Sequence, residues 1–215
     1  MIEYMKDTVT RWLRWSEKYT GVDMVYFMSG NFWLFAGRVI AMGSGFILTV
    51  GFANLLSQDD FGTYKYVLAM AGMVGAFTLT GVLPATQLSL AKGYSNVIRP
   101  MVVYATKWSV GGIIAALAVS GYYFYMGNAL LGAALLVVAI TTAFSGLSIT
   151  KALFTATGDF RRASIYNAVR SVVPVAFVLA TLLLTHNVLA IIAVYFASQT
   201  IASIITYKLS LRTIQ

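Results

Sequence analysis

Arg38 is the side chain whose position most needs a chemical explanation. It lies about two helical turns into the first long apolar run of the chain, where a guanidinium costs several kcal/mol unless it is paired or hydrated. No acidic residue lies inside any of the apolar runs, so the sequence offers no partner there. Two interpretations stay open. The side chain reaches back to the headgroups at the membrane surface, or it faces a cavity and binds an anion such as phosphate or diphosphate, whose oxygens match the planar fork of donors.

Gln87 and Gln199 are weaker candidates for the same kind of site. They lie deep in the second and the last of the apolar runs, where either amide could line a polar path for a substrate. Hydrogen bonding between helices explains them as well, and it is the role that we expect first.

The sequence gives little support for a catalytic site. Ser145 and His186 would be the pair of an intramembrane serine protease, but Ser145 falls roughly 25 Å below the outer turn that holds His186. The chain has no cysteine, one histidine and seven carboxylates, which disfavours thiolate chemistry and metal clusters. We therefore expect neither an enzyme nor a cofactor.

The elements that carry these residues are predicted to be membrane-spanning helices. Of the 215 residues, 59% are hydrophobic and 10% are charged, whereas soluble domains carry roughly 25% charged residues. A span needs about 20 apolar residues. The sequence predicts an all-α, polytopic transmembrane bundle with six spans, at residues 32–56, 66–91, 108–125, 129–150, 168–185 and 188–207.

The basic residues alternate from one side of these spans to the other. Both ends of the chain and the second and fourth connections are rich in lysine and arginine, whereas the odd-numbered connections hold only Lys65. The positive-inside rule predicts that both termini are cytoplasmic and that the protein is a multi-pass cell-membrane protein. The net charge of +8 then suits the anionic lipids of the inner leaflet, and we expect no nucleic-acid partner.

Three local features refine this outline. Residues 1–30, in which aromatic and basic residues alternate, read as an amphipathic leader on the inner surface, and 31–215 as the helical lobe. In the first span, Gly37, Ala41 and Gly45 share a four-residue spacing that marks a helix-packing face. Pro84 predicts a kink in the second span, either shaping the packing or bordering a water-filled cavity.

One segment resembles a known family. The first span ends in 53–64, which reads ANLLSQDDFGTY, an apolar helix followed by a short acidic turn and Phe61-Gly62-x-Tyr64. Here the chain resembles the polysaccharide biosynthesis proteins that flip lipid-linked oligosaccharides, within the multidrug/oligosaccharidyl-lipid/polysaccharide exporter superfamily. We read Gly62 as allowing a close turn, and Phe61 and Tyr64 as anchors at the outer interface.

The resemblance implies a transporter. Members of the family are built from two six-helix lobes around a V-shaped cavity whose cations receive a lipid diphosphate headgroup, and this chain is similar to the amino-terminal lobe. Arg38 is the residue that we carry into that role, with a lipid-linked saccharide as substrate and membrane lipids as surroundings. We expect the missing wall to come from a second copy or a second six-helix lobe. A multidrug-extrusion-type carrier, a scaffold without transport activity and a truncated remnant stay open as alternatives.

Overall fold

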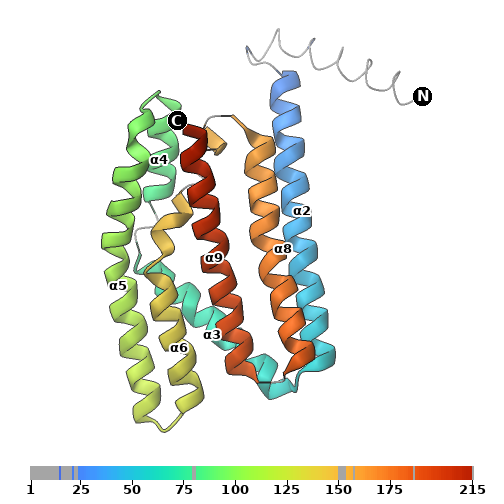
Figure 1. Ribbon diagram of the computed structural model, residues 1–215, viewed down its shortest axis with the longest axis vertical. Coiled ribbons are helices and arrows are strands. Elements are labelled where there is room, and N and C mark those ends of the chain that lie inside the picture. The colour runs from blue at the N-terminus through green and yellow to red at the C-terminus, as the bar shows by residue number, and fades with distance from the viewer. Residues whose placement is uncertain are drawn as a thin grey trace, which may run out of the picture.

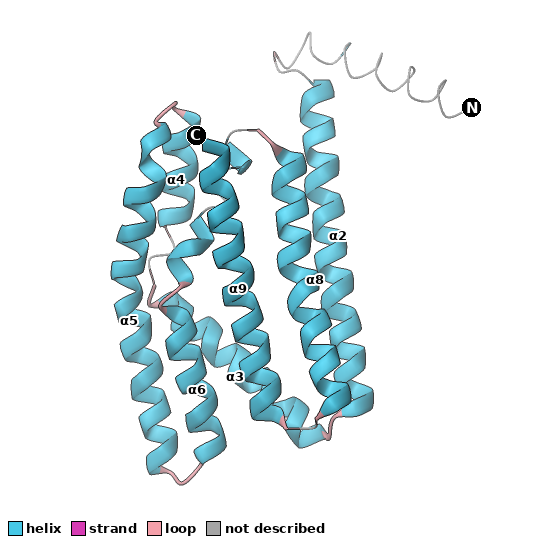
Figure 2. Cartoon of the chain, viewed as in Figure 1, coloured by secondary structure: helices cyan, strands magenta, loops and turns pink. Residues whose placement is uncertain are grey.

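The computed structural model describes residues 15, 21, 24–78, 81–149, 154–156, 158–185 and 187–214. Within these ranges every regular element is a helix, as Figure 2 shows, which confirms the predicted all-α class. The elements, labelled in Figure 1, are α2 (Met24–Leu55), α3 (Gln58–Ala76), α4 (Val82–Ala91), η1 (Ser95–Val97), α5 (Ile98–Tyr125), α6 (Ala129–Thr142), η2 (Ser145–Ile149), α8 (Phe160–Leu184) and α9 (Val188–Ile214).

Four of the described helices are long and apolar enough to cross a membrane: Gly30–Leu55, Arg99–Tyr125, Phe160–Leu184 and Val188–Lys208. Two of the six expected spans are divided instead. The second is split between α3 and α4, and the fourth consists of α6 followed by the 3₁₀ helix η2. The helices α4 and α6, of 10 and 14 residues, are each too short to cross alone.

The division of the second span lies before Pro84 and not at it. Helix α3 ends at Ala76 and α4 starts at Val82, so Pro84 is the third residue of a new helix. A proline is tolerated in the first turn because its missing N–H has no partner there, whereas in a helix interior its ring clashes with the carbonyl four residues earlier. The predicted kink at Pro84 is thus replaced by a break one turn upstream of it.

Polar side chains fix where three of the helices begin. The Oγ of Ser57 accepts a hydrogen bond from the Asp60 N–H at 3.1 Å before α3, and Asn128 and Asp159 cap α6 and α8 in the same way. Each satisfies an N–H group that has no partner within its own helix. Gly127, with a φ of 79°, provides the left-handed residue that reverses the chain between α5 and α6.

The helices form one parallel pair and one antiparallel pair, which two other helices join. Helix α2 packs along α8, α5 packs along α6, and α9 contacts both α8 and α6. Figure 1 shows α3 crossing obliquely from the α2–α8 pair toward the α5–α6 pair. The chain enters α2, turns from α4 to α5, begins α8 and ends α9 at one end of this bundle.

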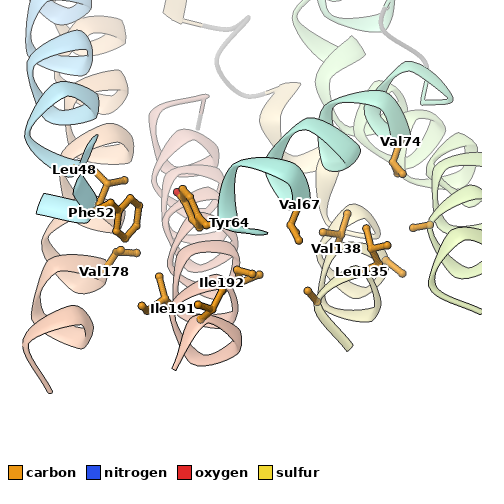
Figure 3. Close-up of a cluster of buried hydrophobic side chains, with 14 of the residues drawn as sticks. Leu48, Phe52, Tyr64, Val67, Val74, Leu135, Val138, Val178, Ile191 and Ile192 are labelled. Atoms are coloured by element: carbon orange, nitrogen blue, oxygen red, sulfur yellow. The ribbon is translucent and has the colours of Figure 1, made fainter. Parts of the chain in front are cut away.

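The main hydrophobic core lies around α3, near the other end. Phe52, Tyr64, Val67 and Ile192 are at most 2% exposed, and Figure 3 shows them coming from α2, α3 and α9. The ring centroids of Phe52 and Tyr64 are 4.5 Å apart. Helix α3 packs against helices of both pairs and therefore holds the bundle together at this end.

Glycine packing between α2 and α8 follows a spacing of seven residues and not four. A Cβ would overlap Phe160 of α8 if added to Gly30 and Ser164 if added to Gly37. One at Gly51 would lie 2.7 Å from Leu179, whereas one at Gly45 would meet nothing within 4 Å. Residues eight apart are rotated by about 80° on a straight helix, so Gly45 leaves the contact face. The packing prediction is confirmed for Gly37 and wrong for Gly45.

The predicted leader falls mostly outside the described residues. Its carboxyl-terminal part, residues 24–30, belongs to α2, so the expected boundary at residue 30 lies inside a helix. His186 also lies outside the described residues.

Candidate functional site: two cationic clefts

The structure brings two of the three predicted site residues together. Arg38 of α2 and Gln87 of α4 line the same cleft, of about 660 Å³. This Arg38 cleft is completed by Asn31, Leu34, Phe35, Gly37, Leu83, Thr155, Ala163, Ser164 and Asn167. Its walls therefore come from α2, α4, α8 and the short segment before α8.

The Arg38 cleft has a cation and no carboxylate in its lining. In the described part of the chain, the carboxylates are those of Asp59, Asp60 and Asp159, each at the start of a helix. Arg38 itself is exposed. An uncompensated guanidinium beside amide and hydroxyl groups attracts an anion with several oxygen acceptors.

Local packing explains why Arg38 faces this cleft. Gly37 lies against Ser164, whose hydroxyl donates to the Trp33 carbonyl one turn earlier on α2. This contact fixes the rotation of α2 on α8. Arg38 follows Gly37 directly, so its side chain emerges beside the α2–α8 contact, toward the space that α4 closes from the other side.

Gln199 lies in a different pocket. This pocket has a volume of about 300 Å³ and takes Arg170 of α8 together with residues of α3, α6, η2 and α9. The Gln199 amide donates to the Tyr195 hydroxyl at 3.4 Å, one turn away on the same helix. The expected hydrogen bond between helices is therefore wrong for Gln199, and Gln87 makes none with a described residue.

Arg170 is the functional candidate that the sequence did not reveal. The expected span began at residue 168, so Arg170 lay at its cytoplasmic edge, next to the charges of the connection before it. Helix α8 begins eight residues earlier, at Phe160, because Asp159 caps it there. Arg170 thereby becomes the eleventh residue of a 25-residue apolar helix, and the aspartate before a helical pattern was the signal for it.

The family motif is built into the core and not into an interface. Tyr64 is 2% exposed and packs on Phe52 and Tyr195, so its expected role as an interfacial anchor is wrong. Gly62 lies inside α3, without a positive φ and with open space around it, so it forms no turn. The Phe61 ring packs at 6.0 Å from Phe52 and lies under the Lys65 ammonium.

Ser145 and possible metal-binding groups are the candidates that remain. Ser145 begins η2 and lines the pocket that holds Arg170. Among the described residues, no group of three or more His, Cys, Asp or Glu side chains gathers where it could hold a metal ion.

A helical bundle with four helices of membrane-spanning length and composition defines the class as an α-helical membrane protein. No protein-family model matches the chain, and neither does any curated protein or solved structure. The likeness to oligosaccharide flippases stays a prediction from the 53–64 segment.

Proposed function

We propose that this chain is one lobe of a flippase that moves a polyprenyl-diphosphate-linked oligosaccharide across the cell membrane for polysaccharide export. The observation that carries the proposal is the Arg38 cleft. It has a volume of about 660 Å³ and is lined by a cation of α2 and a glutamine of α4, with no carboxylate in the lining. A volume of this size is within the range of ligand sites. A diphosphate carries negative charge that balances the guanidinium and oxygens that accept its hydrogen bonds.

The charge of the bundle supports an orientation for this function. Among the described side chains, the end at which α4 turns into α5, α8 begins and α9 ends carries Lys92, Arg99, Arg161, Arg162 and Lys208. The opposite end, where α3 begins, has Lys65 with Asp59 and Asp60. By the positive-inside rule the basic end is cytoplasmic. The Arg38 cleft lies in that half, where a lipid headgroup of the inner leaflet is within reach.

The divided spans support movement of a polar group. Irregular backbone at membrane depth is tolerated where it borders a polar cavity or is buried in protein. The Arg38 cleft takes Leu83 and Gln87 from α4, just after the break in the second span, and the pocket of Arg170 takes Thr78 from just before it. Broken helices of this kind occur at the substrate sites of transporters.

A carrier for cationic drugs fits the Arg38 cleft less well than an anion carrier. Its one charged lining residue repels a cation, and no described carboxylate offsets it. The proposed flippase has a second wall opposite Arg38, from another copy or a second six-helix lobe, because the side chain is exposed on this unit.

Complementation of polysaccharide export separates a flippase from a scaffold. In cells that depend on this protein, Arg38→Ala should abolish export while the protein stays in the membrane at its normal level. Arg38→Lys, which keeps the charge but loses the fork, should retain part of the activity. Full export by Arg38→Ala would favour the scaffold.

A further inference from the structure

Arg170 is a half-buried cation that the proposed headgroup site does not use. It is the eleventh residue of α8, about 15 Å along the helix axis from the capped end. It lines a pocket of about 300 Å³ together with Tyr195 and Gln199 of α9, which we call the Arg170 pocket. A charge at such depth in an apolar helix needs compensation.

The described chain does not supply that compensation. Arg170 makes no hydrogen bond or ion pair with a described residue, and no carboxylate lines the pocket. Helices α3 and α6 end beside it, and their carboxyl ends offset part of a positive charge. Two of their terminal carbonyls are already engaged, however: that of Gly75 accepts from the N–H and hydroxyl of Thr78, and that of Thr141 accepts from the Phe144 N–H.

The other polar groups of the pocket show which chemistry is missing. The hydroxyls of Thr142, Thr200 and Ser203 donate to carbonyls of their own helices, at 2.8–2.9 Å. The Tyr195 hydroxyl accepts from Gln199 and keeps its own proton free. The guanidinium of Arg170, the Tyr195 O–H and the second amide N–H of Gln199 donate to no acceptor among the described residues. A ligand of this pocket must accept hydrogen bonds.

We propose that the Arg170 pocket binds a small monovalent inorganic anion of halide size. The anion would accept hydrogen bonds from Tyr195 and Gln199, and its negative charge would compensate that of Arg170 inside the bundle. A volume of about 300 Å³ holds such an ion with several waters, since each water takes about 30 Å³ in the liquid. The site is separate from the Arg38 cleft, and its existence does not depend on the proposed transport.

Chloride NMR on the purified full chain in detergent tests the site directly. Chloride in exchange with a protein site gives a broadened signal, and a titration at constant ionic strength, with gluconate as the replacing anion, yields the affinity. The variants are Arg170→Gln, which removes the charge but keeps a polar side chain, and Arg38→Gln as the matched control in the other cleft. Size-exclusion profiles check that each variant is folded.

The wild type and Arg38→Gln should broaden the chloride signal equally, and Arg170→Gln should bind chloride at least about tenfold more weakly. Tyr195→Phe, which removes one hydroxyl from the pocket, should weaken binding about three- to tenfold and serves if Arg170→Gln does not fold. Absence of broadening with the wild type would overturn the proposal. So would equal broadening by the wild type and a folded Arg170→Gln, or by the wild type and Tyr195→Phe.

Discussion

The hydroxyl of Ser164 on α8 donates a hydrogen bond to the main-chain carbonyl of Trp33 on α2, and Gly37 leaves the space in which it does so. The two helices approach closely here because neither carries a bulky side chain at the contact. This contact also sets the direction of Arg38, the next residue along α2. Packing and the candidate site are therefore coupled at this point.

Replacing Gly37 by leucine should separate α2 from α8. Overpacking of a tight contact costs about 1–3 kcal/mol, and a chain of this length loses about 2–4 °C of Tm for each kcal/mol. Thermal unfolding of the detergent-solubilised protein, followed by its tryptophan fluorescence, measures the loss. The control is Gly45→Leu on the same helix, which meets open space and should leave the Tm unchanged or raise it slightly, since leucine favours a helix more than glycine does. Equal Tm values for both variants would contradict the assigned contact.

The family motif should separate into a structural residue and a replaceable one. Tyr64 lies in the main core at 2% exposure, so Tyr64→Ala should lower the free energy of unfolding by about 3 kcal/mol or more. Gly62 lies inside α3 with free space around it, so Gly62→Ala should raise it by up to about 1 kcal/mol. Thermal unfolding compares the two. A destabilising Gly62→Ala would show that this glycine has a role that the fold does not reveal.

The second wall of the proposed cavity should be visible in the mass of the protein. Arg38 is exposed on this unit, and an exposed guanidinium at membrane depth needs a facing protein surface or water. We expect light scattering, corrected for bound detergent and lipid, to give a stable dimer or a complex with a second helical lobe. A monomer that stays monomeric at all accessible concentrations would move the scaffold ahead of the flippase.

Sequence periodicity predicted the helical class and most helix positions, because long apolar runs permit little else in a membrane. It missed the division of two spans. In the run 66–91 no charge marks the break. Gly81, directly before α4, and Pro84, inside it, are weak signals because both residue types also occur within membrane helices. The fourth run is divided where Gly146 of η2 packs against the backbone of Thr106 on α5, a tertiary contact that local sequence does not encode.

The candidate site was predicted in part for a similar reason. A charge inside an apolar run is visible in the sequence, so Arg38 could be found, and Gln87 joins it in one cleft. Arg170 stood near the edge of its run, and its depth depends on where α8 begins. The capping by Asp159 extends that helix and carries Arg170 into the bundle, which hydropathy alone does not show.

Lipid binding to the Arg38 cleft tests the central claim most directly. Native mass spectrometry of the protein in nanodiscs should show retention of a polyprenyl diphosphate in preference to the corresponding monophosphate. Arg38→Gln should weaken diphosphate binding about tenfold or more, whereas Arg170→Gln, in the separate Arg170 pocket, should leave it unchanged. Equal diphosphate binding by the wild type and Arg38→Gln would contradict the assignment of this cleft as a headgroup site.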